Sequence, residues 1–385
     1  MDNYTPSQRT WKKFRRNKFA VSGVLIIVLM VLMGLSGYLI MPDKTTMAND
    51  MLLQLSIKKP GSKFTILKLR KTERIDTANI FEKMLFGQPS FYKKIPITSY
   101  RFKSDSIIVR EYIGDDEPAE ESAYALKEVT GKKEWLSNPF SAQNQLYDYI
   151  IKNNIQQKTF WLGTDIYGRD LLSRLILGIR ISFSVGIVAV IISLLIGVSL
   201  GALAGFYGGR IDAFISWLMN VVWSLPALLL VIAISFALGK GFWQIFIAIG
   251  LSMWVEVARL VRGQVLSFKQ VEFVEAAKAL GFSNGRIILR HILPNIAGPV
   301  LVVASSNFAS AILLEAGLSF LGFGAQPPIP TWGGMIKEHY GYIIMDAAYL
   351  AILPGLAIML MVYAFNLVSL GLQDAFDVKS NNTNV

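Results

Sequence analysis

The sequence predicts an all-α polytopic membrane protein with six transmembrane helices and a small extracytoplasmic α+β insertion. Hydrophobic residues make up 53% of the 385 residues and charged residues only 17%, which is too apolar for a soluble domain of this length. Six stretches lack Asp, Glu, Lys and Arg, and most exceed the roughly 20 residues that a helix needs to cross a bilayer. These stretches cover residues 19–41, 181–209, 213–239, 241–255, 291–314 and 347–373.

The first and fourth stretches need separate arguments. The first follows a basic tail, as in a signal peptide, but it is longer than the roughly 7 to 15 apolar residues of a signal-peptide core, so we expect an uncleaved span. The fourth is short, and we expect its helix to continue through Glu256 to about Leu260. That extension places one acid near a helix end, where it can reach headgroups or a partner.

Basic residues predict the orientation, because short cytoplasmic flanks of membrane spans are enriched in Lys and Arg. They gather in the N-terminal tail (Arg9, Lys12, Lys13, Arg15, Arg16, Lys18) and after the fourth span (Arg259, Arg262, Lys269, Lys278, Arg286, Arg290). Six spans put both segments and the C-terminus on one side. We therefore expect a multi-pass protein of the cytoplasmic (inner) membrane with both termini in the cytoplasm. The net charge of +11 could suggest nucleic acid, but the basic residues cluster beside spans, so we expect membrane lipid and no nucleic acid as a partner.

The spans divide the chain into segments with different surroundings. They are a cytoplasmic basic tail (1–18), a first transmembrane helix (19–41), an extracytoplasmic domain (42–160), a transmembrane domain (161–373) with a cytoplasmic loop at 262–294, and a cytoplasmic tail (374–385).

The extracytoplasmic domain is hydrophilic and mixed in pattern. Alternating residues at 63–66 and 106–110 predict strands, and residues 142–154 predict a helix. The stretch 114–122, rich in Asp, Glu and Pro, predicts a loop. Four aromatic residues are candidates for contact with a soluble partner outside the membrane, namely Phe91, Tyr92, Tyr100 and Trp135.

Residues 171–180 show helical periodicity ahead of the second span. Leu171, Leu175 and Ile179 fall on one arc, and Arg174 and Arg180 lie largely elsewhere. The pattern predicts an amphipathic helix lying at the membrane surface.

The loop at 262–294 predicts a helix, a sharp turn and a second helix. Gly281 interrupts the first helix, Ser283 caps the second, and Pro294 ends it before the next span. Small residues before the turn let another backbone approach closely. A narrow arc of the first helix holds Phe273, Ala276, Ala277 and Leu280.

Residues of this loop resemble the EAA loop of ABC importer permeases. The match consists of Glu275-Ala276-Ala277, then Gly281, then Ile292-Leu293-Pro294. In that family the loop sits in a groove of the ATPase subunit and transmits its closure to the membrane helices. The resemblance implies an ATPase-coupling role for Glu275, Ala276, Ala277, Gly281, Leu293 and Pro294.

Other motifs resemble the dipeptide, oligopeptide and nickel branch of binding-protein-dependent permeases. They are Trp161-Leu162-Gly163-Thr164-Asp165, Gly168-Arg169-Asp170, Leu318-Ser319-Phe320-Leu321-Gly322-Phe323-Gly324 and Trp332-Gly333. The span at 19–41 resembles the extra first helix that the second permease of these systems adds to a core of five. The insertion at 42–159 is longer than this branch predicts.

The resemblance implies a permease subunit of an ATP-driven ABC importer that translocates peptides by alternating access. It implies as partners a second homologous permease, two ABC ATPase subunits and an extracytoplasmic substrate-binding protein. A nickel or nickel-chelate importer is the alternative within the branch. An ion-coupled secondary transporter needs ionisable residues deep in the spans, and Glu256 and Glu315 are both expected near span ends.

The composition speaks against an enzyme. The chain has no cysteine and two histidines, and it lacks a Gly-x-x-x-x-Gly-Lys-Ser/Thr phosphate loop. We therefore expect no catalytic, cofactor or metal site, with ATP and Mg²⁺ used by the partner ATPase subunits.

Polar residues within the spans are candidates for a translocation path, because polar groups are costly against lipid. Helix packing is the alternative for each of them. Pro226 and Pro354 are expected to kink their spans. The polar candidates are Asn220, Ser224, Ser305, Ser306 and Asn307.

Overall fold

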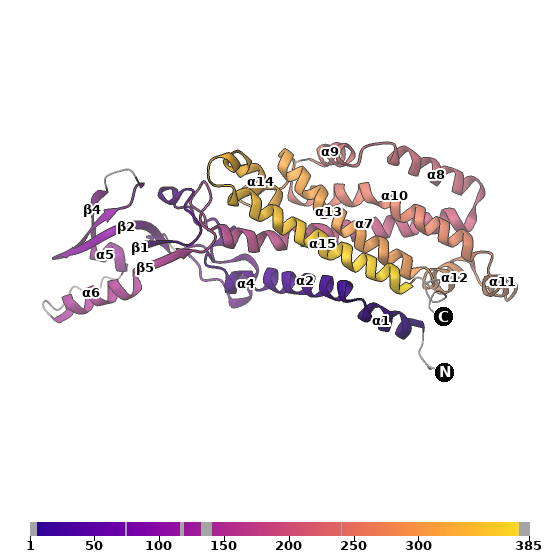
Figure 1. Cartoon of the computed structure of the whole chain (residues 1–385), viewed down its shortest axis with the longest axis horizontal. Coiled ribbons are helices and arrows are strands. Elements are labelled where there is room, and N and C mark those ends of the chain that lie inside the picture. Colours follow the sequence, from indigo (N-terminus) through magenta and orange to yellow (C-terminus); the bar gives the residue numbers. More distant parts are fainter. Residues whose placement is uncertain (1–5, 74, 116–118, 132–140, 240, 377–385) are drawn as a thin grey trace. The chain divides into compact units, whose positions relative to one another are not determined.

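The computed structural model of the chain describes residues 6–73, 75–115, 119–131, 141–239 and 241–376 (Figure 1). The chain forms two compact units. The first holds most of the apolar helices and comprises residues up to Leu32, Ile179–Glu338 and those from Ile352 onward. The second holds a β-sheet and comprises Met33–Gly178 with His339–Ala351.

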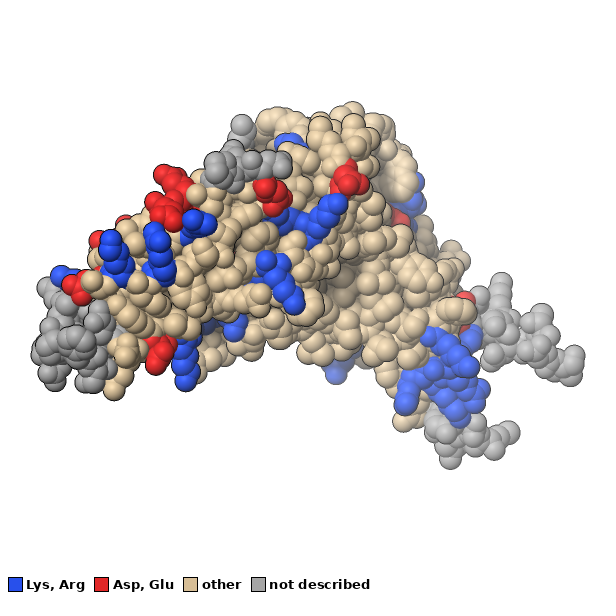
Figure 2. Space-filling view, turned by 60° about the vertical axis from the view of Figure 1, so that its left-hand side comes forward, with Lys and Arg blue, Asp and Glu red and all other residues tan. Residues whose placement is uncertain are grey.

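Among the described residues, five helices are long and apolar enough to cross a membrane, as predicted for five of the six stretches. Their outward apolar side chains, such as Leu25 and Leu195 at 66% and 67% exposed, suit contact with lipid tails. Much of the surface in Figure 2 carries no charged side chain. The five are α2 (Lys18–Leu35), α7 (Leu171–Tyr207), α10 (Phe242–Phe268), α13 (Ala297–Leu321) and α15 (Tyr349–Phe376).

The remaining stretch, 213–239, is broken where a single span was expected. Helix α8 (Gly209–Trp223) and helix α9 (Ala227–Leu238) meet at 98°. Pro226 caps the start of α9, because a residue without an N–H cannot continue the helix of α8. The expected kink is thus a break. The number of spans reaches six only if α8 and α9 together form one span. Pro354, by contrast, lies inside α15, which continues past it.

Helix α7 packs against α10 through a stripe of glycines. Gly197, Gly201 and Gly205 recur every four residues on one face, and a Cβ at each would lie 2.5–2.7 Å from a backbone carbonyl oxygen of α10. Small residues at this spacing let two helix backbones approach closely in a membrane. The carbonyl oxygens belong to Trp254, Ala258 and Arg262.

The described part of the N-terminal tail contains a helix that was not expected. Helix α1 (Pro6–Arg16) precedes α2, and Asn17 joins them by accepting hydrogen bonds from the N–H groups of Phe19 and Ala20 at 3.1 Å. Phe14 of α1 packs against Ala20 and Ala375. After α2, a short helix α3 (Gly37–Ile40) completes the first predicted span.

In the part of the second unit that the structure describes, the sheet has five antiparallel strands in the order β4-β3-β2-β1-β5. One face packs on α5 (Leu126–Thr130) and α6 (Ser141–Asn153) around buried aliphatic residues such as Leu67, Ile95 and Ile107. Helix α4 (Ile80–Phe86) lies between the first two strands in sequence. The strands are β1 (Ser62–Arg70), β2 (Tyr92–Lys103), β3 (Ser106–Glu111), β4 (Glu120–Ala125) and β5 (Ile155–Phe160).

These elements confirm both predicted strands and the predicted helix of the insertion. The end of the predicted loop at 114–122 belongs to β4, which begins at Glu120, and residues 116–118 of that prediction lie outside the described residues. Trp135 lies outside the described residues, as do residues 377–385 of the predicted C-terminal tail.

The segment 171–180 differs from the expected surface helix. It is the first part of α7, which runs without a break into the second span. Leu171 and Ile179 are buried, but so are Ser173 and Arg174 at 0% and 2% exposed. Protein therefore covers its polar side as well, and a helix at the membrane surface with one face in water does not describe it.

Candidate coupling loop and transport pathway

The EAA loop (residues 262–294) has the predicted helix, turn and helix. Helix α10 ends at Phe268, α11 spans Glu272–Ala279 and α12 spans Asn284–Ile287. A π-helical turn, Ile288–Ile292, then leads through Pro294 to α13. Ser283 stands at the predicted cap position of α12, but its hydroxyl makes no capping hydrogen bond.

Gly281 closes α11 in a left-handed conformation with φ of +73°. The N–H of Phe282 donates to the carbonyl oxygen of Ala277 at 3.1 Å, and the N–H of Gly281 donates to that of Lys278 at 2.9 Å. This pair of bonds is the Schellman arrangement, which satisfies carbonyl groups that the helix end leaves unpaired. A Cβ at position 281 would meet nothing within 4 Å, so the backbone angle, rather than crowding within the chain, requires glycine here.

The two sides of α11 have different surroundings. Val274 and Ala277 are buried in a core with Ile287 and other residues of α7, α10 and the loop. Glu275 and Ala276 are exposed, and so are Phe273 (38%) and Leu280 (73%). The small residues expected to admit another backbone are therefore divided, because Ala277 packs against the helices and Ala276 remains on the surface.

The end of the loop is also divided between core and surface. Leu293 packs against the same core as Ala277, and Pro294 is exposed. The ring of His291 stacks on that of Phe282, with ring centroids 5.9 Å apart. Arg286 lies over the Phe282 ring at 4.4 Å, so this ring links the turn to the second half of the loop.

The polar candidates for the translocation path fall into two groups. Ser305 donates to the carbonyl oxygen of Phe365 at 3.2 Å, and the amide of buried Asn307 donates to the hydroxyl of Ser193 at 3.4 Å. These bonds join different helices, as the helix-packing alternative expects. Ser306 is half-buried beside them. Asn220 in the last turn of α8 and Ser224, which caps the end of that helix, are instead exposed.

A cavity of about 340 Å³ lies where α8 and α9 meet α10 and α13, and we call it the break cavity. Its walls are mainly apolar, with Trp223 and Leu225 from the break and Leu314 from α13. Glu256 supplies its one carboxylate, beside the hydroxyl groups of Ser252 and Ser310.

The position of Glu256 corrects the sequence prediction. Helix α10 extends to Phe268 rather than Leu260, so Glu256 lies near its middle instead of its end. The sequence contains a signal for the longer helix, because Val257, Val261 and Val265 continue the apolar periodicity. All three side chains are buried in the structure. Glu315 lies six residues before the end of α13 as expected, where Ser319 donates to its carboxylate at 2.7 Å.

Two arginines of α10 hold α8, and sequence reasoning gave neither a role in the path. Arg262 binds Asp212 through two hydrogen bonds, at 2.5 Å from Nε and 2.7 Å from Nη2. Arg259 lies over the ring of Trp223 at 4.3 Å and donates to Asn220 at 3.5 Å. The broken span is therefore tied by charge to the helix that carries Glu256 and leads into the EAA loop.

In the second unit, the motif at 161–174 forms a buried polar network. Asp165 accepts a hydrogen bond from Nε of Arg169 at 2.6 Å, and both side chains are at most 1% exposed. Gly168 takes φ of +71° where a Cβ would lie 1.8 Å from the carbonyl oxygen of Leu52, so only glycine fits. The side chain of Asp170 accepts two hydrogen bonds from Ser173, at 2.8 Å from its N–H and 2.6 Å from its hydroxyl.

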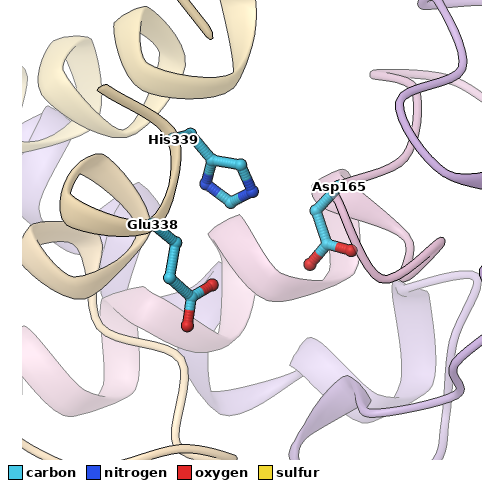
Figure 3. A group of neighbouring side chains, drawn as sticks. All are labelled: Asp165, Glu338 and His339. Atoms are coloured by element: carbon cyan, nitrogen blue, oxygen red, sulfur yellow. The ribbon is translucent and has the colours of Figure 1, made fainter. Parts of the chain in front are cut away.

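The imidazole of His339 points toward the carboxylate of Asp165 (Figure 3). A ring nitrogen of His339 lies within 4.8 Å of a carboxylate oxygen of Asp165. Glu338, also drawn, directly precedes His339 in the chain. A histidine beside carboxylates is a pattern seen at metal sites. Here, however, the guanidinium of Arg169 already supplies the counter-charge of Asp165, and we interpret the group as part of the ion-pair network.

Comparisons with known proteins agree with these features. Residues 197–381 match the family described as the binding-protein-dependent transport system inner membrane component, and residues 5–56 match the N-terminal transmembrane domain of oligopeptide transport permease C. The glutathione transport system permease protein GsiD of Pectobacterium atrosepticum is 41% identical over 241 residues, covering 63% of this chain and 79% of that protein. The chain belongs to this permease family.

Another relative and a solved structure extend the comparison. The dipeptide transport system permease protein DppC of Alkalihalophilus pseudofirmus is 44% identical over 219 residues, covering 57% of this chain and 72% of the relative. An inward-facing structure of the methionine ABC transporter MetNI aligns with a TM-score of 0.43 and 17% identity, over 52% of this chain and 97% of that one. As a binding-protein-dependent permease, the chain is a membrane-spanning transport subunit and not an enzyme.

Proposed function

We propose that this permease is one half of the membrane pathway of an ATP-driven importer that translocates peptides across the cytoplasmic membrane by alternating access. The observation that carries the proposal is the exposed face of α11 beside the rigid Gly281 turn, in a chain whose relatives transport glutathione and dipeptides. Both named cargoes are short peptides, which favours a peptide over a nickel chelate.

The coupling residues are proposed to act in two ways. Glu275, Ala276, Gly281 and Pro294 are exposed and form the surface for an ATPase subunit. Ala277 and Leu293 pack against the helical core and transmit the displacement of that surface to α10 and α13. Two ATPase subunits, which bind ATP and Mg²⁺, are expected with a second homologous permease.

The path itself is proposed to run along the exposed face of α8 and the break cavity. Asn220, Ser224 and Glu256 supply its polar groups, and the bend at Pro226 provides a place where the path changes width. Ser305 and Asn307 support it by joining helices. Ser306 stays a candidate on its sequence alone.

Transport assays distinguish this proposal from an ion-coupled secondary transporter. The chain is reconstituted with its partner subunits in proteoliposomes, and uptake of a labelled dipeptide is measured with ATP on the side of the EAA loop. We expect uptake to require ATP and the substrate-binding protein on the opposite side. Uptake driven by a proton or sodium gradient without ATP would contradict the proposal.

The proposed orientation has the EAA loop and both termini in the cytoplasm and the sheet unit outside. Because the chain has no cysteine, single cysteines at exposed Lys103 and Lys278 give background-free labelling sites. A membrane-impermeant maleimide is expected to label Lys103→Cys in intact spheroplasts and Lys278→Cys only after lysis. The reverse pattern would invert the topology.

A further inference from the structure

The second unit contains a large pocket with a strong excess of positive charge, which we call the lysine pocket. Its volume is about 780 Å³, and its walls come from the end of α3, the segments on either side of α4, and strands β1, β2 and β5. The only acid among its lining residues is Asp43, whose carboxylate accepts hydrogen bonds from the N–H groups of Thr45 and Asp50. The basic lining residues are Lys44, Lys68, Lys83, Lys94 and Lys158.

The sheet register brings like charges together in this pocket. Lys68 on β1 stands directly opposite Lys94 on β2, and like charges at such positions destabilise a sheet. An ion pair with Asp50 partly offsets this repulsion for Lys94. Lys68 has two lysines, Lys94 and Lys158, as its charged neighbours, and burial together with these charges lowers the pKa of Lys68. An anion seated among the three would relieve this repulsion.

The pocket adjoins the end of the first membrane span. Helix α3 follows α2 after a single residue, and Leu39 and Ile40 of α3 are 55% and 54% exposed. Tyr38 and Leu39 line the pocket. Because a span ends at the bilayer surface and α3 follows it directly in the chain, Tyr38 and Leu39 are expected close to the lipid headgroups.

Helix α4 adds an apolar surface beside α3. Ile80, Phe81 and Phe86 are 83%, 72% and 63% exposed, which is unusual for a helix facing water. The helix is held next to α3 at Gly87, where a Cβ would lie 2.6 Å from the ring of Tyr38. Lys83 of the same helix lines the pocket. Apolar residues on a short helix with a lysine toward the headgroups are typical of a segment that inserts into the membrane interface.

We propose that the lysine pocket binds the phosphate of an anionic phospholipid headgroup, with the exposed side chains of α4 inserted among the acyl chains. Charge complementarity selects an anionic lipid, and the apolar side chains at the span end select a lipid over a soluble anion. Trp161, 65% exposed at the rim, suits the same depth, because tryptophan is enriched at membrane interfaces. The lipid fastens the sheet unit to the membrane surface independently of transport.

Native mass spectrometry of the full chain tests this proposal. Phosphatidylglycerol or phosphatidylcholine is titrated onto the detergent-purified protein and bound lipid is counted. The variant is Lys68→Gln/Lys94→Gln/Lys158→Gln. The control is Lys63→Gln/Lys93→Gln/Lys103→Gln, which removes the same charge at three exposed lysines of β1 and β2 outside the pocket. We expect phosphatidylglycerol affinity to fall about fivefold per lysine, or about 100-fold for the pocket variant, and to stay unchanged in the control.

Other outcomes would overturn it. Equal phosphatidylglycerol binding by the pocket variant and the wild type would remove the lysines from lipid binding, provided circular dichroism shows both folded. Equal binding of phosphatidylcholine would remove the role of charge, and displacement of the lipid by inorganic phosphate alone would indicate a free-anion site. Phe81→Ser/Phe86→Ser gives an independent test, since it keeps every lysine and is expected to weaken binding of intact lipid while leaving phosphate binding unchanged.

Discussion

The N–H of Phe282 donates to the carbonyl oxygen of Ala277 across the turn made by Gly281, at 3.1 Å. Ala277, one partner of this bond, is buried in the helical core, and the ring of Phe282, the other partner, contacts both His291 and Arg286. The turn therefore connects α11 and α12 at a set angle. A force applied to the exposed face of α11 would reach both α10 and α13 through it.

Replacing Gly281 is expected to uncouple transport without removing the protein from the membrane. Gly281→Val places a β-branched residue in the left-handed region, at roughly 1–2 kcal/mol, and adds bulk on the surface. Gly281→Asn tolerates that backbone angle better and adds bulk alone. Because both block close approach of a partner, we expect uptake to fall about tenfold or more in both, at unchanged membrane abundance.

The two variants separate the effect of backbone strain at position 281 from the effect of added bulk on the surface. Normal uptake with Gly281→Asn would restrict the role of Gly281 to backbone shape. Normal uptake with both would remove the turn from coupling.

The parts of the fold that were predicted correctly from the sequence depend on local patterns. The five unbroken spans, strands β1 and β3, helix α6 and the turn at Gly281 each follow from periodicity or a single residue's backbone preference. The break at Pro226 was expected only as a kink, because its 98° angle depends on how α9 packs against α10 and α13.

Packing between distant segments also determines the candidate site, and the sequence alone does not predict it. Ala277 shares a helical arc with Ala276, yet it is buried because Ile287 and Ile292 fold back over that side of α11. The sequence alone does not show which face a distant segment covers. The ties of Arg259 and Arg262 to α8 are likewise long-range, joining residues about forty to fifty positions apart.

The Asp212–Arg262 pair is expected to stabilise the broken span. The two side chains are 21% and 32% exposed, so we expect a coupling energy of about 1 kcal/mol. Asp212→Asn, Arg262→Gln and the double variant form a cycle, measured by thermal unfolding in detergent together with uptake. Additive effects of the two single substitutions would show that the pair does not interact.

Arg169 is expected to be essential for the stability of the sheet unit. Arg169→Ala removes the nearer of two buried counter-charges of Asp165, at 2.6 Å, and leaves Arg174 at 3.6 Å. Because breaking a buried pair completely typically costs about 3–5 kcal/mol, we expect a loss toward the lower end of that range. Lys59→Ala is the control, because it removes an exposed ion pair with Asp346 in the same unit. We expect a large loss of protease resistance in the first variant and none in the second. Equal resistance would contradict a structural role for the buried pair.

Asp170 is expected to make stability depend on pH. Burial raises the pKa of Asp170 above its ordinary value of 3.8, although its hydrogen bonds from Ser173 oppose the shift. The carboxyl of Asp170 therefore keeps its proton to higher pH in the folded state than in the unfolded state. The protonated carboxyl contributes its full stabilisation below pH 3.8, and this stabilisation is lost as pH rises through the raised pKa. Asp170→Asn is expected to flatten that part of the melting profile. A profile identical to that of the wild type would contradict the assignment.

Glu256 is expected to recognise the positively charged amino terminus of the peptide cargo. It is the one carboxylate of the mainly apolar break cavity, with the hydroxyl groups of Ser252 and Ser310 beside it. A hydrogen bond to a charged group contributes about 1.5–3 kcal/mol, so Glu256→Gln is expected to raise the KM for a free dipeptide by about 10- to 100-fold. An N-acetylated dipeptide, which lacks the charge, should lose far less. Glu315→Gln is the control, since Glu315 bonds Ser319 outside the break cavity. Equal losses for free and acetylated peptides would show that Glu256 supports the helix rather than the cargo.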